Sequence, residues 1–458
     1  MSNLMTLGLQ TAKYLMIVLM AIYTFQSFAV FKRSGAQAKD MVFLRQDVCI
    51  FMFQFLGYLV LFLKTMNAQL IISYAAQALY LAFTLLLFRN LYPKASRLLI
   101  NNMCMLLTIG MIMITRLSSD WSVKQFWIIC AGTVLALVIP VIIRKLSFLT
   151  KMTWAYVVAG IGLLLLVVVA AQVTNGAKLA LTVGGFAFQP SEFVKIIFVF
   201  AVAGLLSDAR GDLRKIILAT GLAAVHVLIL VISTDLGSAL IFFVTYLIML
   251  YAATGNPFLV SAGLLAGAAA AVLAYFLFSH VRVRVSVWLD PFADYANTGY
   301  QISQALFAIA AGGWFGTGLC EGSPTAIPYV AQDCMFAAIC EELGAVFAIC
   351  LILVCLSCFI MFINIAMKLT NRYYRLVALG LGTTYAMQVF LTIGGTTKLI
   401  PLTGVTLPLV SYGGSSVLST LIMFAIVQGL YMLRIDEEKE DEKERQDPRR
   451  IPGEGDPA

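Results

Sequence analysis

The chain has 458 residues, of which 61% are hydrophobic and 12% are charged, and its mean hydropathy is +0.92. Soluble domains are about 45–50% apolar and about 25% charged, so these values exclude a soluble globular protein and predict a polytopic membrane protein. The net charge of +8 comes from Lys and Arg that gather in alternate loops, as membrane topology requires, so nucleic-acid binding is not expected.

About thirteen apolar runs follow one another along the chain, each close to the 17–25 residues that cross a bilayer core. They fall at roughly 12–31, 48–63, 69–89, 98–115, 125–143, 153–171, 190–206, 215–232, 235–253, 258–279, 335–363, 375–396 and 415–433. We therefore expect an all-α fold of about thirteen transmembrane helices.

Basic residues follow the odd-numbered runs, and the positive-inside rule places such loops in the cytoplasm. Examples are Lys32 and Arg33 after the first run, Arg89 and Lys94 after the third, and Arg144 and Lys145 after the fifth. The N-terminus is then predicted outside and the C-terminus inside, with the connections 172–189, 280–334 and 397–414 outside. The charged segment 435–458 has too few apolar residues to fold and is predicted to be a disordered cytoplasmic tail.

The stretch QPSEFVKI places two ionisable residues in the seventh run, where charge is costly and often functional. Pro190 suits the first position of a helix. Glu192 and Lys195 follow at i, i+3 spacing and share one helix face, where they can pair. Two compatible readings remain open: a neutralising ion pair within a capped helix, or the charged wall of an outward-facing cavity.

The longest connection, RVRVSVWLDPFADYANTGYQ onward, concentrates charge that the rest of the chain avoids. Arg284 precedes Asp290, Pro291 biases Asp290 away from helical geometry, and Asp294 follows. Residues 300–315 look like a short amphipathic helix at the membrane–water interface. Beyond it, Asp333 and Glu341 are expected near one face of the eleventh membrane helix.

The segment LIPLTGVTLPLVSYGGSS is apolar but broken by Pro and Gly. Such a segment suggests a re-entrant loop that is buried in protein or lines a cavity. Ser411, Tyr412, Ser415 and Ser416 offer hydroxyl groups there, and Lys398 supplies a positive charge at its outer edge.

Five stretches, QPSEFVK, DLGSAL, WLDPFADYANTGYQISQALFAIAAGGWFGTG, EELG and PLTGVTLPLVSYGGSS, resemble in order and spacing the SEDS family (shape, elongation, division and sporulation), typified by FtsW, RodA and SpoVE. The resemblance covers residues 98–434, about ten helices, with 280–334 as the catalytic loop. Residues 1–97 are left as an addition of about three helices.

The resemblance implies a peptidoglycan glycosyltransferase of the bacterial cytoplasmic membrane that polymerises lipid II and works with a class B penicillin-binding protein. The family's proposed catalytic aspartate falls on Asp290, its Glu and Lys on Glu192 and Lys195, and an upstream Arg on Arg284. The chain departs from the family's Leu-Pro-Glu-x-His-Thr-Asp run, because IPYVAQD keeps only Pro328 and Asp333. A role in division, elongation or sporulation stays open.

The chemistry that the resemblance implies needs a general base, because a sugar hydroxyl is a weak nucleophile, and Asp290 is the candidate. A single displacement inverts the anomeric centre, and undecaprenyl pyrophosphate leaves. Its charge is met by Arg284, Lys195 or Lys398, or by a divalent cation such as Mg²⁺ or Mn²⁺ that carboxylates hold. Two other functions compete: a transporter that flips lipid II, and a non-catalytic scaffold that recruits the penicillin-binding protein.

Overall fold

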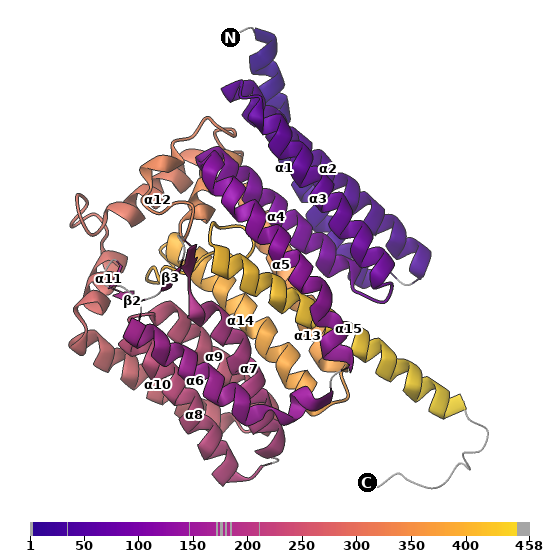
Figure 1. Cartoon of the computed structure of the whole chain (residues 1–458). Coiled ribbons are helices and arrows are strands. Elements are labelled where there is room, and N and C mark those ends of the chain that lie inside the picture. The colour runs from indigo at the N-terminus through magenta and orange to yellow at the C-terminus, as the bar shows by residue number, and fades with distance from the viewer. Residues whose placement is uncertain are drawn as a thin grey trace.

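The computed structural model describes residues 3–33, 35–145, 147–170, 173–174, 177–178, 181–183, 186–209 and 211–446, and these form a bundle of long helices (Figure 1). The helices are α1 (Asn3–Lys32), α2 (Ala36–Thr65), α3 (Gln69–Leu91), α4 (Arg97–Leu117), α5 (Ser119–Lys145), α6 (Thr153–Ala170), α7 (Pro190–Ala209), α8 (Leu213–Ile232), α9 (Leu236–Thr254), α10 (Pro257–Leu277), α11 (Ser279–Leu289), α12 (Tyr300–Gly312), α13 (Met335–Lys368), α14 (Arg372–Thr396) and α15 (Gly414–Gln446). The 3₁₀ turns Ser147–Lys151 and Pro324–Ala326 interrupt two connections.

Every predicted membrane run coincides with a helix, which confirms the all-α polytopic fold. Within the described ranges, 12 helices are long and apolar enough to cross a membrane. Helix α7 is outside that set, and it carries Glu192, Lys195 and Asp208. It nevertheless packs against α6, α8, α9 and α14 inside the bundle, where an additional membrane helix is expected.

Two short β-hairpins join α6 to α7. Strand β1 (Val173–Thr174) pairs antiparallel with β2 (Ala177–Lys178), and β3 (Leu181–Val183) pairs antiparallel with β4 (Phe186–Phe188). The remaining residues of the predicted outer connection 172–189 lie partly outside the described residues.

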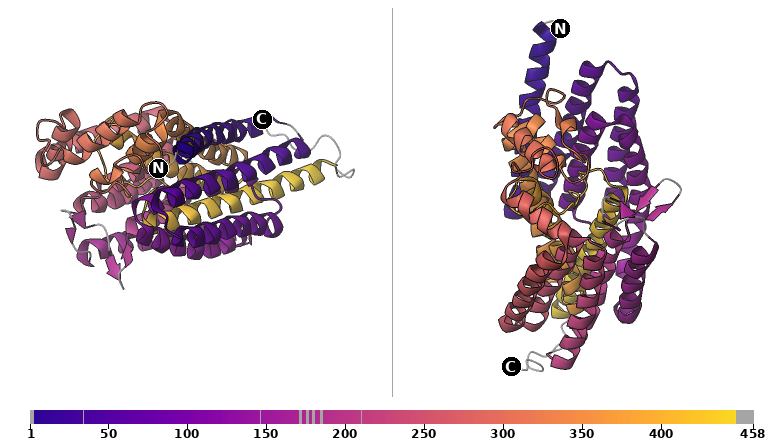
Figure 2. Two further views of the ribbon diagram at one scale, coloured as in Figure 1. Left: turned by 90° about the horizontal axis from the view of Figure 1, so that it is seen from above. Right: turned by 90° about the vertical axis from the view of Figure 1, so that its left-hand side faces the viewer.

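The start of α1 and the α11–α12 region lie toward one end of the bundle, and the end of α15 lies at the other (Figures 1 and 2). This arrangement fits the prediction that the N-terminus and the 280–334 connection share one side of the membrane. The assignment of that side to the cell exterior stays a prediction.

The N-terminal helices are joined to the rest of the bundle by a buried polar network. The Tyr23 hydroxyl of α1 donates to Asn102 Oδ1 of α4 over 2.9 Å, and Asn102 Nδ2 donates to Ser357 Oγ of α13 over 2.7 Å. Asn101 of α4 donates to Gln46 Oε1 of α2 over 3.2 Å. Polar groups in a membrane interior need partners within the protein, so this network fixes α1 and α2 against α4 and α13.

The sequence predicts no helix in the first part of the 280–334 connection, and this prediction is wrong. Part of the 280–334 connection is helical, because α11 covers Ser279–Leu289 after a break at Phe278 and ends before Pro291. The short helix predicted near 300–315 is confirmed as α12 (Tyr300–Gly312).

The predicted disordered tail is helical as far as Gln446, because α15 continues past the membrane span. Its Glu- and Lys-rich sequence favours helix, and Arg434 pairs with Glu438 one turn later at 3.0 Å. Asp436 also pairs with Arg144 at 2.5 Å and with Lys94. Residues 447–458 lie outside the described residues.

Helix α13 is interrupted at Gly344, whose φ of 86° is left-handed. The segment after α12 fits into this break: Ala345 N donates to Gly313 O over 2.9 Å, and Gly318 N donates to Glu342 O over 2.9 Å. The connection between α12 and α13 is therefore fastened to the bundle by main-chain hydrogen bonds and is not a free loop.

Candidate active site

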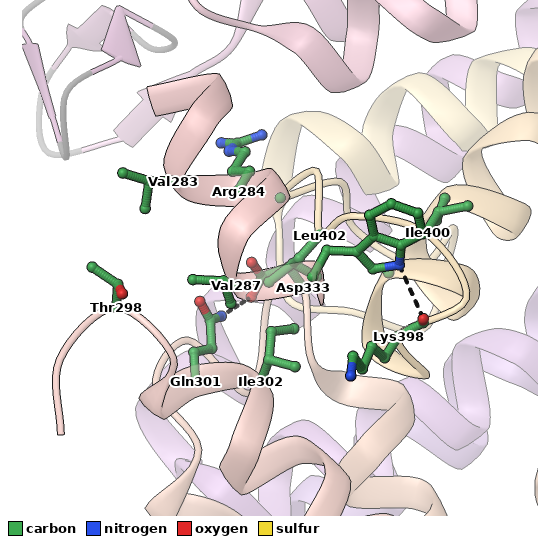
Figure 3. Close-up of a pocket in the computed structure, with 13 residues that line it drawn as sticks. Val283, Arg284, Val287, Thr298, Gln301, Ile302, Asp333, Lys398, Ile400 and Leu402 are labelled. Atoms are coloured by element: carbon green, nitrogen blue, oxygen red, sulfur yellow. Dashed lines mark hydrogen bonds between the residues drawn. The ribbon is translucent and has the colours of Figure 1, made fainter. Parts of the chain in front are cut away.

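A pocket of about 160 Å³ lies where α11 and α12 meet the end of α14 and the irregular segment that follows it. Its lining is Val283, Arg284, Val287, Trp288, Thr298, Gln301, Ile302, Asp333, Gly395, Lys398, Ile400, Leu402 and Gly404. Figure 3 shows Val283, Arg284 and Val287 on one helix, with Gln301 and Ile302 on another. Two predicted residues, Arg284 and Lys398, thus lie in one pocket although 114 positions separate them in the sequence (398 − 284 = 114).

Two cationic side chains, Arg284 and Lys398, and one carboxylate, Asp333, line the pocket. Arg284 Nη1 donates to Thr403 O over 3.3 Å, which links α11 to the irregular segment. Trp288 Nε1 donates to Lys398 O over 3.2 Å, one turn further along α11. Lys398 has a left-handed φ of 61°, and its ammonium group has no partner among the described residues. Both cations are available to an anionic group in the pocket.

Asp333 is the carboxylate of the pocket. Gln301 Nε2 of α12 donates to Asp333 Oδ1 over 3.1 Å (Figure 3). The same nitrogen donates to Pro328 O over 3.1 Å. Burial raises the pKa of Asp333 to about 6, although the hydrogen bond from Gln301 and the charge of Arg284 oppose the rise. Burial likewise lowers the pKa of the Arg284 guanidinium, and Asp235 and Asp333 oppose that shift.

Gln301 is not among the site residues predicted from the sequence, and Asp333 is predicted there only as an alternative base after Asp290. Asp333 was expected on a membrane helix, but α13 begins at Met335, so Asp333 lies in the turn before it and does not share a helix face with Glu341. The sequence did contain a signal for Asp333, because it is the last residue of IPYVAQD and matches the aspartate that ends the family's motif. Gln301 carried no signal beyond its polarity in an amphipathic helix.

Asp290 lies at the C-terminal end of α11, outside the pocket lining and exposed to solvent. Its Oδ1 accepts a hydrogen bond from Phe292 N over 3.0 Å, and its Oδ2 has no partner among the described residues. Trp288, two residues earlier, lines the pocket. Asp290 therefore stands beside the pocket with one oxygen free to accept a proton.

The turn after Asp290 is held against α12. Ser303 Oγ donates to Pro291 O over 3.3 Å, and a Cβ atom on Gly299 would lie 1.9 Å from Pro291 O, so only glycine fits there. Asp294 holds the same turn, because it accepts from Thr298 Oγ1 over 2.7 Å and from Thr298 N over 3.1 Å. These bonds, with one from Asn297, hold the pKa of Asp294 below its usual value. Asp294 thus shapes the loop and does not line the pocket.

Glu192 and Lys195 lie buried between helices and do not line this pocket. Lys195 Nζ donates to Glu192 Oε2 over 2.6 Å and to Gln388 Oε1 of α14 over 2.7 Å. Ser419 Oγ of α15 donates to the same Glu192 oxygen over 2.9 Å. The pair joins α7 to α14 and α15, an arrangement that favours the ion-pair reading over the cavity-wall reading.

The irregular segment between α14 and α15 is held by the predicted hydroxyl groups. Ser411 Oγ accepts from Leu407 N over 3.0 Å, and Gln388 donates to Ser416 Oγ over 3.2 Å. Tyr412 stacks on Trp121 of α5 with ring centroids 5.4 Å apart, and Ser415 Oγ accepts from Gln189 N over 3.0 Å.

Residues 407–411 of this segment are buried, as a re-entrant loop predicts. The same segment presents Lys398, Ile400, Leu402 and Gly404 to the pocket. The hydroxyl groups therefore position the pocket wall and do not form it.

The model of the FtsW/RodA/SpoVE family of cell cycle proteins matches residues 96–435. Stage V sporulation protein E of Bacillus subtilis is 32% identical over 345 residues, which cover 70% of this chain and 92% of that protein. The peptidoglycan glycosyltransferase RodA of Mycobacterium tuberculosis is 41% identical over 268 residues, 55% of this chain. The chain spans only 57% of that relative's length.

The fold also resembles a solved structure. A chain from the study "Structural coordination of polymerization and crosslinking by a peptidoglycan synthase complex" superposes with a TM-score of 0.64 at 24% identity. The alignment covers 74% of this chain and 98% of that one, and at this identity it supports the fold alone. The family match and the Bacillus relative together show that this chain is a multi-pass protein of the cytoplasmic membrane and belongs to the FtsW/RodA/SpoVE family.

Proposed function

We propose that this protein is a peptidoglycan glycosyltransferase that polymerises lipid II into glycan strands at the outer face of the membrane. The single observation that carries the proposal is the pocket of Arg284, Lys398 and Asp333 next to Asp290. A pyrophosphate leaving group needs fixed positive charge, and the attacking hydroxyl needs a carboxylate with a free oxygen. In the proposal, Arg284 and Lys398 meet the first requirement, and Asp290 meets the second.

In the proposed reaction, Asp290 Oδ2 takes the proton of the attacking sugar hydroxyl. The oxygen then forms the new glycosidic bond at the anomeric carbon of the lipid-linked sugar. The bond to undecaprenyl pyrophosphate breaks with inversion, and the leaving group departs with its electron pair. Arg284 and Lys398 stabilise the charge that develops on that pyrophosphate, because paired charges in a partly dry pocket interact more strongly than in water.

A divalent cation, Mg²⁺ or Mn²⁺, is part of the proposal. Asp333 is the single carboxylate of the pocket lining, and such ions are commonly held by one or two carboxylates together with substrate phosphates. Asp333 would hold the ion, which would supply further positive charge for the leaving pyrophosphate. Among the described residues, no group of three or more His, Cys, Asp or Glu side chains is arranged to hold a metal. We therefore expect binding of the cation to require substrate.

We propose a class B penicillin-binding protein as the partner that cross-links the product. Support comes from the resemblance in fold to a chain of a synthase complex that joins polymerisation to crosslinking. The choice between division, elongation and sporulation depends on which partner is bound, and it is tested by copurification with each penicillin-binding protein of the same cell.

The test is a polymerisation assay on the purified full chain with its class B partner, whose transpeptidase site is blocked. Labelled lipid II is supplied with Mg²⁺ or Mn²⁺, and parallel reactions contain EDTA. Glycan ladders that weaken in EDTA are expected. Absence of ladders from a folded complex would contradict the proposal. Movement of lipid II across the membrane of vesicles made with this protein would then identify a transporter. If lipid II does not move, a non-catalytic scaffold is the function that remains.

A further inference from the structure

A second cavity, of about 500 Å³, lies between α1 and α2 and the segment that leads from α12 to α13. Its lining is Leu9, Gln10, Lys13, Tyr14, Met16, Val60, Lys64, Thr317, Gly318, Leu319, Glu321 and Leu343. More than half of these residues precede position 96, where the family match begins. The N-terminal helices therefore build a cavity against the core that the core alone would lack.

The cavity carries an excess of positive charge. Its charged lining residues are two lysines, Lys13 and Lys64, and one carboxylate, Glu321, which leaves one positive charge in excess. Lys64 pairs with Glu321. Lys13 has no ion-pair partner within the described part of the chain, and its ammonium group lies 5.3 Å from the ring centroid of Tyr14. One ammonium group at this cavity thus lacks an anion.

Lys13 lies near the start of the apolar span Leu7–Lys32, where a long lysine side chain can reach the lipid headgroups. Beside the cavity, the Tyr14 ring contacts the Phe315 ring, with centroids 6.0 Å apart. Tyr14, Trp314 and Phe315 are 52%, 68% and 51% exposed. Exposed aromatic residues mark the membrane–water interface, so the cavity lies at the level of lipid headgroups.

Much of the remaining lining is apolar. It includes Leu9, Met16, Val60, Leu319 and Leu343, together with the polar residues Gln10 and Thr317. A ligand that combines one negative charge with hydrocarbon matches the unpaired Lys13 and these apolar residues. A lipid with a phosphodiester headgroup and no compensating ammonium group has this composition, whereas a zwitterionic lipid brings a positive charge that Lys13 would repel.

We propose that this cavity binds the phosphate of an anionic phospholipid through Lys13, with Lys64 at its side. The acyl chains lie along the apolar residues of the lining. Because Glu321 and Gly318 belong to the segment that is fastened to the break in α13, the bound lipid would support the connection between α12 and α13.

The test is native mass spectrometry of the purified full chain in neutral detergent, with phosphatidylglycerol or phosphatidylcholine added. We expect wild-type protein to retain one phosphatidylglycerol in preference to phosphatidylcholine. Lys13→Gln should weaken that retention about tenfold, the loss expected for one charge-assisted contact, and Lys13→Arg should keep most of it. The matched control is Lys124→Gln, an exposed lysine near the start of α5, which should retain phosphatidylglycerol as the wild type does.

Two results would overturn the proposal. Equal retention by folded Lys13→Gln and wild-type protein would remove the site, and displacement of the lipid by millimolar inorganic phosphate would make the occupant a free phosphate. If Lys13→Gln does not fold, wild-type protein still gives a test: its preference for phosphatidylglycerol must fall as NaCl is raised. Asp290→Asn protein should bind the lipid normally, so failure of the polymerase proposal leaves this result unaffected.

Discussion

A catalytic carboxylate is expected to lie in the pocket and to have a free oxygen, and here these two properties belong to two residues, Asp333 and Asp290. Asp333 lies in the pocket, accepts from Gln301 and faces the field of Arg284. Asp290 is exposed, with one oxygen held by Phe292 N. The sequence predicts Asp290 because a WLDP motif resembles a family signature, but it cannot predict the environment of Asp333, which is made by α11, α12 and α14 together.

The pKa of Asp333 predicts a pH profile. Its pKa is raised to about 6, so the carboxylate is charged above that pH and protonated below it. If its charge helps to hold substrate or cation, the polymerisation rate should fall as the pH drops through about 6. Asp333→Asn should remove this inflection, and Gln301→Leu should move it to higher pH, because the lost hydrogen bond favours the charged form. Initial rates measured from acid to neutral pH decide this, and the same inflection in Asp333→Asn would contradict it.

At the scale of elements, the apolar runs predict the membrane helices well because length and hydropathy are local properties. Helix α11 was missed because RVRVSVWL alternates polar and apolar residues with a period of two, which is not a helical pattern. The helix also follows α10 after only one extended residue, Phe278. The helical tail to Gln446 was missed because few apolar residues were taken to predict disorder, although the Glu- and Lys-rich sequence favours helix and Arg434 pairs with Glu438. The contacts of Asp436 with Lys94 and Arg144 could not be predicted, because these residues are distant in sequence.

The contact between the Asp290 turn and α12 can be tested at one glycine. A side chain at Gly299 would meet the carbonyl oxygen of Pro291 at 1.9 Å, so the turn must move. Gly299→Ala should slow polymerisation about 10- to 100-fold while the helix content is unchanged, because misplacement of a reacting group by about 1 Å has an effect of this size. Gly221→Ala is the control, since its side chain would meet nothing within 4 Å. Wild-type activity in Gly299→Ala would show that the position of this turn is not critical.

At the scale of the whole molecule, the three N-terminal helices are part of one bundle. The sequence separates residues 1–97 because the family resemblance starts after them, but it does not reveal how they are attached. Asn102 of α4 contacts Tyr23 and Ser357 at once, which no local pattern predicts.

Removal of the Asn102 amide should therefore destabilise the whole protein. Asn102→Leu leaves the buried Tyr23 hydroxyl without its acceptor, and a loss of roughly 1–3 kcal/mol is expected. The midpoint of thermal unfolding in detergent measures the effect, with the exposed Asn90→Leu as control. An unchanged midpoint for Asn102→Leu would mean that the N-terminal helices contribute little to stability through this network.

The most direct test of the proposed chemistry compares Asp290→Asn with wild-type protein in the polymerisation assay. Asparagine keeps the shape and can still accept from Phe292 N through Oδ1, but it cannot take a proton. We expect the rate to fall by about 100-fold or more, as for removal of a general base, while Asp120→Asn at the start of α5 keeps full activity. Glycan ladders of equal intensity from Asp290→Asn and wild-type protein would contradict the assignment of the base to Asp290.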